Sequence, residues 1–282
     1  MAPPPSLAEA RRHFAEELRV VAHVQDERVI DAFATVPRER FVGPGPWRVL
    51  NLFEGYWTTP DADPRWLCHN VLVALDESRG LNTGEPSLWA LHFDRLGVQR
   101  GDRVLQIGAG SGYFTAILAE LAGPEGRVLA FEIDPTLAVA AEQNLQAWPN
   151  ASVRHVDGIA PIEGKWDVVI AFAGSTAPPL GWLDALAEGG RALIPLTGAQ
   201  RSGMILRVDR HDSAFAARYV GWVGIFHCAG ARNDEEAAAL LRAMADPAGQ
   251  RAIKWLRRDR HDADESCWLH GNGWCLSKRE PP

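Results

Sequence analysis

The sequence predicts an α/β fold organised around a largely parallel β-sheet. A short buried strand over 104–107 runs into the glycine turn 108–112, and a helix over 114–121 follows with apolar residues at helical spacing. Further strand patterns lie at 127–132, just before 155–158, at 166–172 and at 191–195. A strand, a glycine turn and a helix open many nucleotide-binding units, and strands that alternate with helices favour a parallel sheet.

The form of the glycine turn narrows the class of ligand. Gly108, Gly110 and Gly112 have the spacing G-x-G-x-G, whereas a dinucleotide site has a third glycine where this chain has Tyr113. A dinucleotide also places its pyrophosphate at the helix N-terminus. S-adenosylmethionine (SAM) carries no phosphate, so its loop mainly has to clear space for the ligand. A glycine turn alone is weak evidence of function, and the segments that follow it carry more weight.

Acidic residues follow at the ends of the next two predicted strands. Glu132 ends a strand about twenty residues past the glycine turn, a spacing that suits a ribose diol. Asp157 lies where the following strand ends and would accept a hydrogen bond from an adenine amino group. The expected cofactor-binding residues are Gly108, Ala109, Gly110, Gly112, Tyr113, Glu132, Ile133, Asp157 and Gly158.

This ordered series resembles the class I SAM-dependent methyltransferases, and more narrowly the protein-L-isoaspartate O-methyltransferases. Residues 36–42, Val-Pro-Arg-Glu-Arg-Phe-Val, resemble that family's V-P-R-x-x-F-V segment, and Asp157-Gly158 resembles its D-G motif. The likeness covers roughly residues 26–198. It implies SAM as cofactor and a Rossmann-like fold with a mostly parallel seven-stranded sheet, helices on both faces, an N-terminal helical and lid segment and a C-terminal extension.

A second segment, residues 80–86, falls where this family carries a G-x-T-I-S-x-P-like sequence. The resemblance implies that the segment touches methyl donor and substrate, so Asn82, Thr83, Gly84 and Glu85 form the predicted catalytic set. The family's serine, which contacts the substrate carboxylate, is replaced here by Gly84, and Glu85 adds a negative charge. Gln106 likewise replaces an acidic residue that often precedes the glycine loop. The alternative is that this stretch only starts a helix over 88–96, capped by Ser87.

Composition excludes several classes of function. The chain has 282 residues, 46% of them hydrophobic, and a net charge of -7 without a basic stripe, so we expect neither nucleic acid nor a membrane as partner. The N-terminus lacks the charged and apolar regions of a secretion signal, which favours a cytoplasmic location. The four cysteines form no C-x-x-C pair and are expected to be free thiols. We also expect a monomer.

We expect three parts: N-terminal helices and a substrate lid over 1–97, a SAM-binding core over 98–230, and a helical extension over 231–282. Two interpretations of the Trp- and Pro-rich stretch 43–66 stay open, a lid or a structural connection. The extension is predicted to hold helices over 233–245 and 248–258 and a strand-like end at 267–277. Four polar residues in its turn lack a recognised metal spacing, so we expect no metal and exposed side chains: His261, Asp262, Asp264 and Glu265.

The chemistry favours methylation of a carboxylate. Methyl transfer needs donor and acceptor held close and aligned, and a carboxylate is already ionised at neutral pH and needs no base. A phenol or amine acceptor would want a base, for which His155 and His227 are candidates. We therefore predict an O-methyltransferase acting on a carboxylate of a peptide, protein or small natural product. The alternatives are true isoaspartate repair, a non-catalytic SAM-binding scaffold protein and, disfavoured by Tyr113, an NAD-dependent enzyme.

Overall fold

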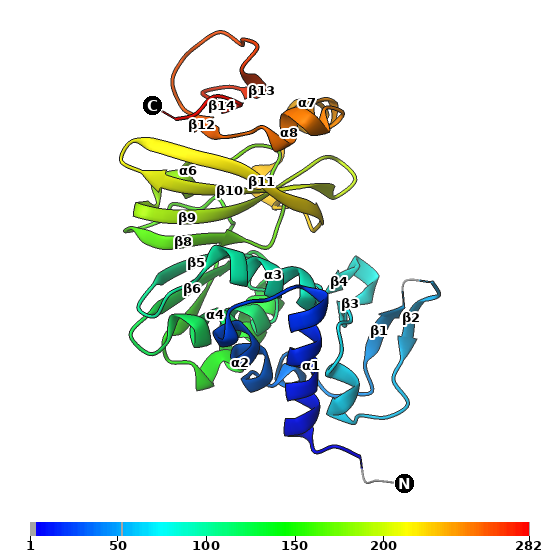
Figure 1. Cartoon of the computed structure of the whole chain (residues 1–282). Coiled ribbons are helices and arrows are strands. Elements are labelled where there is room, and N and C mark those ends of the chain that lie inside the picture. The colour runs from blue at the N-terminus through cyan, green and yellow to red at the C-terminus, as the bar shows by residue number, and fades with distance from the viewer. Residues whose placement is uncertain (1–3, 52, 282) are drawn as a thin grey trace. The chain divides into compact units, whose positions relative to one another are not determined.

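The computed structural model describes residues 4–51 and 53–281 (Figure 1). The α-helices are α1 (Leu7–Val21), α2 (Glu27–Thr35), α3 (Pro86–Leu96), α4 (Tyr113–Ala122), α5 (Pro135–Asn144), α6 (Leu180–Asp184), α7 (Asp234–Met244) and α8 (Pro247–Arg251). The strands are β1 (Arg48–Asn51), β2 (Gly55–Thr58), β3 (Ala74–Asp76), β4 (Leu81–Asn82), β5 (Arg103–Ile107), β6 (Arg127–Glu132), β7 (Ala151–His155), β8 (Trp166–Ala171), β9 (Leu186–Thr197), β10 (Ser202–His211), β11 (Ala214–Gly224), β12 (Trp255–Arg257), β13 (Cys267–Gly271) and β14 (Trp274–Ser277).

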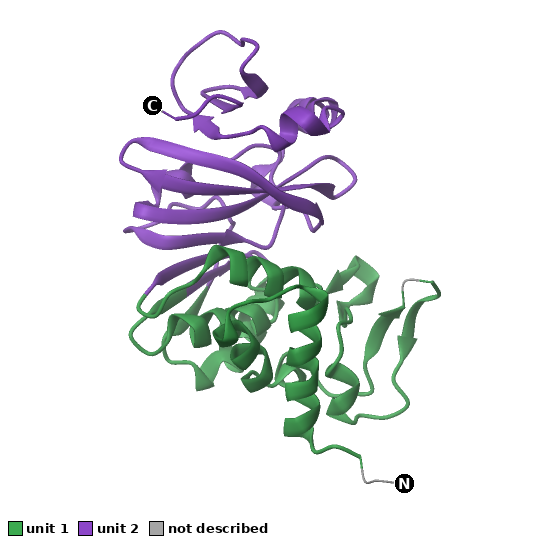
Figure 2. Cartoon of the chain, viewed as in Figure 1, with its two compact units in different colours: residues 1–101, 109–128, 134–153 green, residues 102–108, 129–133, 154–282 purple. Residues whose placement is uncertain are grey.

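The chain divides into two compact units (Figure 2). Unit 1 comprises residues 1–101, 109–128 and 134–153, and unit 2 comprises residues 102–108, 129–133 and 154–282. Each unit is described by itself below. Within the described residues, no helix combines the length and the apolar character needed to cross a membrane.

The N-terminal helices of unit 1 begin after residues whose side chains cap them. The Ser6 side chain accepts a hydrogen bond from the backbone of Glu9, whose carboxylate returns one to Ser6, and Asp26 caps α2. Helix α1 packs on α2, where Phe14 lies edge-on to Phe33 with ring centroids 6.3 Å apart. Helix α2 in turn packs on α4, the helix that follows the glycine turn, because Phe33 lies edge-on to Tyr113 and to Phe114 at 6.3 and 6.4 Å.

The stretch predicted to be a lid or a connection is an ordered hairpin with its own small core. Strands β1 and β2 pair antiparallel, and Trp47, Val49, Leu67 and Val73 are buried together. Next in the chain, β3 and β4 form a second hairpin, and β4 ends at Asn82, the first residue of the predicted catalytic segment. The Trp- and Pro-rich composition therefore builds a folded element, and its covering the methyl donor stays a prediction.

The principal sheet has the strand order β13-β14-β12-β11-β10-β9-β8-β5-β6-β7. β8 runs parallel to β5 and to β9, whereas the pairs from β9 outward to β13 are antiparallel. In unit 2 the core under this sheet combines Leu105, Val169 and Ile194 from the strands with Trp182 of α6 and Leu240 of α7. Carboxyl ends of neighbouring parallel strands such as β5 and β8 meet at one edge, where ligands bind in open α/β sheets.

The number of strands and their mostly parallel direction are corrections to the sequence prediction. The seven expected strands correspond to β5–β11, and the sheet continues through β12, β14 and β13. The long strand β11 would otherwise present unpaired backbone groups at an edge, and β12 pairs with it at Ala216 and Trp255. The strand predicted over 191–195 is longer than expected, because Gly189 and Gly190 also lie inside β9, in an irregular pairing with β8.

The C-terminal extension is helical only in its first part. α7 begins at its Asn233 cap as predicted, but α8 ends at Arg251, and residues 255–257 form β12 where a helix was expected. Trp255, Leu256 and Arg257 pair with β14, and this pairing in the sheet outweighs their local helix propensity. The strand-like pattern at 267–277 is confirmed as the hairpin β13–β14, joined to the sheet through β12.

Candidate active site

The glycine turn adopts the backbone conformation that its sequence requires. Gly108, Gly110 and Gly112 have φ angles of +89°, +56° and +93°, a region that strains residues with a side chain. A Cβ on Gly110 would meet no described atom within 4 Å, so its conformation and not crowding demands glycine. On Gly112, a Cβ would lie 3.3 Å from side-chain atoms of Ala141 and Leu145, where α5 packs on the start of α4. The middle of the loop, at Gly110, therefore keeps open space beside its backbone.

Gln106 has a structural role that the sequence did not reveal. Its side chain is fully buried, and its amide nitrogen donates to the Gly108 carbonyl over 3.0 Å. The Gly108 backbone N–H in turn donates to the carbonyl of Phe131 in β6, over 2.8 Å. An ionised carboxylate at 106 has no proton to donate, so the amide holds the first glycine in a way the acidic residue of the family pattern does not.

The strand ends of unit 2 bring the predicted ribose and adenine residues to one edge of the sheet. Glu132 is the last residue of β6 and is buried, with an exposed fraction of 7%, and its carbonyl accepts from the Val156 backbone N–H over 3.0 Å. Ile133 follows it with its side chain half exposed. The Ile133 carbonyl lies 3.1 Å from His155 Nε2, which gives His155 a structural contact.

Asp157 and Gly158 occupy a crowded turn after β7. The Asp157 carboxylate accepts from the Ile159 backbone N–H over 3.1 Å. A Cβ on Gly158 would lie 2.6 Å from a methyl of Ile107 at the end of β5 and 2.9 Å from the Cys228 sulfur, so only glycine fits there. Trp182 Nε1 donates to the Gly158 carbonyl over 2.8 Å. The D-G motif is therefore fixed against the end of β5.

Sequence reasoning missed the contribution of residues 228–230 to this edge. A Cβ on Gly230 would lie 2.5 Å from the Asp157 carboxylate, so the glycine lets that carboxylate lie against the backbone. Burial, and next the nearby Asp157 charge, raise the pKa of the Cys228 thiol to about 11, which keeps it neutral. No motif marks this stretch, because it lies about seventy residues beyond Asp157 in the chain and only the fold brings the two together.

In unit 1 the predicted catalytic segment forms a tight turn ahead of α3. The Asn82 side-chain oxygen accepts from the Gly84 backbone N–H over 3.0 Å. Gly84 has a φ of +76°, and a Cβ there would lie 3.2 Å from Phe114 and from the Trp89 indole nitrogen. A serine at this position would be strained by the left-handed backbone and crowded by Phe114 and Trp89. The local structure therefore favours glycine over the family's serine.

Buried Arg38 fixes this segment through hydrogen bonds to the neighbouring backbone and to Thr83. The Arg38 guanidinium, 4% exposed, donates to the carbonyls of residues 67, 69 and 71 and to the Thr83 hydroxyl, the last over 3.0 Å. Burial lowers the pKa of Arg38, and in the described part of the chain no carboxylate pairs with it. Its charge lies over the Tyr113 ring, 5.7 Å from the centroid. Arg38 of the V-P-R motif therefore hydrogen-bonds to the segment, and it forms no ion pair with Glu85.

Glu85 lies at the exposed end of the turn. Its carboxylate accepts from the Ser87 hydroxyl over 2.8 Å and from the Asn70 side-chain amide over 3.3 Å. The alternative in which Ser87 caps α3 is wrong, because α3 begins at Pro86 and Asn70 accepts from the Ser87 backbone N–H over 2.9 Å. Arg40 does not offset this charge either, because its guanidinium lies over the Trp148 ring, 5.9 Å from the centroid.

Tyr113 contributes to the core of unit 1 through its side chain. The ring is buried among Phe33, Phe41 and Phe114, and burial raises the pKa of its phenol. The contact with SAM that we predict for this residue therefore rests on its backbone. Ser175 and Thr176, which follow β8, are buried and hydrogen-bonded, Thr176 to Glu236 over 2.7 Å, and both have structural roles.

Three left-handed glycines before a helix, followed by a buried acid and a second acid at successive strand ends, are the features expected of a class I SAM-dependent methyltransferase. Each group suits the part of SAM predicted for it, open space beside Gly110 for the amino-acid end, Glu132 for the ribose and Asp157 for the adenine, and these contacts stay a prediction.

Comparison with known proteins gives the family. The sequence model described as protein-L-isoaspartate(D-aspartate) O-methyltransferase matches residues 71–226, and the chain belongs to this family. It is 31% identical over 224 residues to protein-L-isoaspartate O-methyltransferase 1 of Syntrophobacter fumaroxidans, covering 76% of this chain and 94% of that protein. The corresponding enzyme of Aeropyrum pernix is 34% identical over 193 residues, with 67% of each chain covered.

Solved structures show the same fold. A protein-L-isoaspartate O-methyltransferase superimposes with a TM-score of 0.66 at 22% identity, covering 89% of this chain and 72% of the other. A Plasmodium falciparum protein assigned to that activity, in complex with S-adenosyl-L-homocysteine, gives a TM-score of 0.62 at 18% identity, covering 77% and 97%. The predicted family and fold class are confirmed, and the chain is a SAM-dependent O-methyltransferase.

Proposed function

We propose that this chain methylates a carboxylate of one specific peptide or protein, and that a generic isoaspartyl peptide is a poor acceptor. The observation that carries the proposal is the Asn82–Glu85 turn. Its backbone excludes the serine hydroxyl that the family pattern places on the substrate carboxylate, and it adds the exposed charge of Glu85. A small carboxylic acid is the other acceptor compatible with this turn.

The proposed cofactor contacts follow the sequence prediction. SAM supplies a methyl group on a positive sulfur when it is bound. The glycine loop would hold its amino-acid end, Glu132 its ribose and Asp157 its adenine amino group. Thr83 would help to position the turn and would not transfer a proton, since its hydroxyl accepts a hydrogen bond from Arg38 and donates one to the Gly84 carbonyl. An ionised acceptor needs alignment and not a base, so these residues suffice for a carboxylate.

Repulsion explains why a generic isoaspartyl peptide should fail. Two unit charges 4 Å apart repel by about 4 kcal/mol at an effective dielectric of 20, and by less where water screens them. Arg38 donates elsewhere, so it is not placed to cancel Glu85. A specific partner would have to offset this repulsion through contacts outside the turn.

The test is methyl transfer from labelled SAM to a short isoaspartyl peptide, measured beside an authentic repair enzyme under the same conditions. We expect a much lower kcat/KM for this chain, while labelled SAM and a cell extract yield a discrete methylated product. Comparable turnover on the short peptide would reject the proposal and make general isoaspartate repair the function, which family membership favours.

A further inference from the structure

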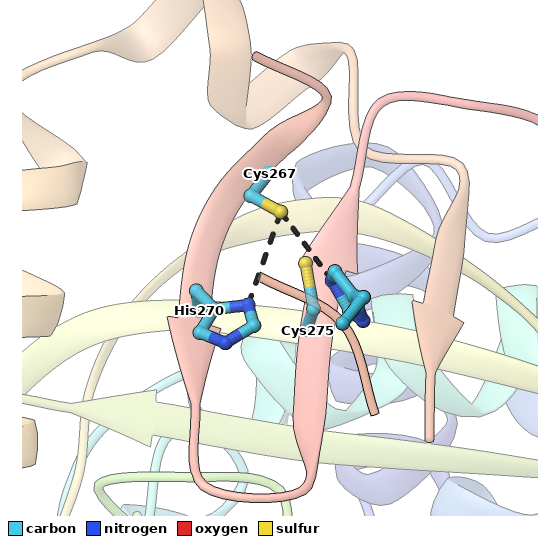
Figure 3. Close-up of side chains that lie close together, drawn as sticks. Cys267, His270 and Cys275 are labelled. Atoms are coloured by element: carbon cyan, nitrogen blue, oxygen red, sulfur yellow. Dashed lines mark hydrogen bonds between the residues drawn. The ribbon is translucent and has the colours of Figure 1, made fainter. Parts of the chain in front are cut away.

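Four potential metal ligands converge in the C-terminal extension, outside the family match. They are His261, Cys267, His270 and Cys275, and one ligand atom from each lies within 4.8 Å of the other three. The Cys267 sulfur is 3.5 Å from His261 Nε2 and 3.9 Å from His270 Nδ1. Figure 3 shows the Cys267, His270 and Cys275 side chains pointing toward one another from the two strands of the hairpin.

A β-bulge produces this convergence. Cys267 and His270 are three positions apart, so on a regular strand they would point to opposite faces. The register places Cys267 opposite Ser277 and Leu269 opposite Leu276, which makes residue 268 an extra residue in β13. His270 is directly opposite Cys275. The bulge therefore puts Cys267, His270 and Cys275 on one face of the hairpin.

That face is separate from the apolar core. Trp274 and Leu276 of β14 belong to the core of unit 2, and Cys275 and Ser277 point to the other face by strand alternation. Cys275 is nevertheless fully buried. The loop between β12 and β13 contributes to this burial, since its His261 reaches Cys267 and its Ser266 is hydrogen-bonded to Ser277 over 3.4 Å.

We infer that His261, Cys267, His270 and Cys275 bind a structural Zn²⁺ ion that fastens the 258–266 loop to the β13–β14 hairpin. Two thiolates and two imidazoles are a tetrahedral zinc set, and two thiolates balance the charge of the ion. With Zn–S near 2.3 Å and Zn–N near 2.05 Å, tetrahedral ligand atoms lie roughly 3.3–3.8 Å apart. The cluster is already close to that size.

Contacts around the ligands support a metal site. His261 Nδ1 lies 3.1 Å from the Asp259 carbonyl, so its Nε2 is directed at Cys267, the arrangement common for ligating histidines. The Asp264 backbone N–H donates to the Cys267 sulfur over 3.5 Å. A disulfide fits less well, because Cys267 and Cys275 are diagonal neighbours, at a Cα separation of about 7–8 Å, beyond the usual 4.4–6.8 Å or so of a disulfide.

This result corrects the sequence expectation for His261. Its side chain is only 12% exposed, although Asp262, Asp264 and Glu265 are exposed as predicted. The spacing H-x₅-C-x₂-H-x₄-C is irregular because the bulge and the hairpin turn, and not a fixed motif, set the geometry.

The experiment purifies the 282-residue chain under reducing conditions, strips it with a chelator and reloads it with Zn²⁺ or with Co²⁺. We expect one equivalent of Zn²⁺ by elemental analysis, and with Co²⁺ the visible bands of a tetrahedral thiolate complex. Cys267→Ser and Cys275→Ser should each weaken Zn²⁺ binding by more than roughly 100-fold, since even residues behind the ligands typically contribute 10- to 100-fold. Cys68→Ser, the same change in unit 1, should leave binding intact.

A second pair of variants covers the case in which a cysteine variant does not fold. His270 is exposed, so His270→Asn should keep the far-ultraviolet circular dichroism of the wild type while weakening Zn²⁺ and altering the Co²⁺ bands. Asp262→Asn, at an exposed neighbour of His261, is the control and should bind as the wild type does. The proposal is overturned if folded wild-type protein takes up no Zn²⁺, if uptake survives in both His270→Asn and Cys267→Ser, or if Cys267 and Cys275 form a disulfide.

Discussion

The glycine loop at 108–112 and the turn at 82–85 both depend on glycines with positive φ, but for different reasons. Gly110 has open space around its missing side chain, so ligand access and backbone conformation alone account for it. Gly84 has Phe114 and Trp89 at contact distance, so packing excludes a side chain as well. The loop follows the family pattern, whereas the turn departs from it in a way that neighbouring residues reinforce. Acceptor recognition, and not cofactor binding, is where this chain is expected to differ.

The largest expected loss of stability comes from removing the Arg38 guanidinium, which hydrogen-bonds to the turn. Arg38→Met leaves buried carbonyls and the Thr83 hydroxyl without their donor, so the free energy of unfolding should fall by on the order of 3 kcal/mol. Urea denaturation measures this loss. Arg40→Met, at an exposed arginine two residues away, is the matched control. Equal losses in the two variants would show that Arg38 does not anchor the turn.

Gly84→Ser tests whether the turn can regain the family residue. A side chain in left-handed backbone costs about 1–2 kcal/mol, and the contacts with Phe114 and Trp89 add to this. We expect a loss of stability of about 2–3 kcal/mol and no gain in turnover of an isoaspartyl peptide. Gly101→Ser, with a φ of +86° and no described atom within 4 Å of its Cβ, isolates the backbone cost. A stable Gly84→Ser variant with improved turnover would contradict the packing argument.

Glu132→Gln tests the expectation that cofactor binding follows the family pattern. Loss of charged hydrogen bonds to a ribose should weaken SAM binding by about 1.5–3 kcal/mol, or roughly 10- to 150-fold, measured by titration calorimetry. Glu125→Gln makes the same chemical change in an exposed turn and should leave SAM affinity unchanged. An unaltered affinity in folded Glu132→Gln would remove Glu132 from the ribose site.

The smallest effect is expected for Glu85→Gln. Its side chain is exposed, so the free energy of unfolding should change by less than about 0.5 kcal/mol. Because one negative charge is removed beside the acceptor, KM for an isoaspartyl peptide should fall by roughly three- to tenfold, more strongly at low salt. Kinetics at two salt concentrations measure this. A KM that does not move would place the acceptor carboxylate away from Glu85.

The sequence by itself determined the elements whose signals are local. The glycine loop, the capped helices α1, α2 and α7, and the acids at the ends of β6 and after β7 follow from periodicity, capping residues and strand-end positions. Gly84 and Glu85 could also be identified as departures from the family sequence. These features depend on residues within one or two turns of the chain, which is why pattern and spacing suffice to predict them.

Only the tertiary structure decided the features that depend on distant pairing. Residues 255–257 form a strand because β14 pairs with them, and three added strands extend the predicted seven. Gly230 meets Asp157, and Arg38 meets Thr83, across tens of residues. The His261–Cys275 cluster needs a bulge in β13, and a one-residue change of register reverses the face on which every later side chain lies. Register is a property of two paired strands, so neither strand's sequence contains it alone.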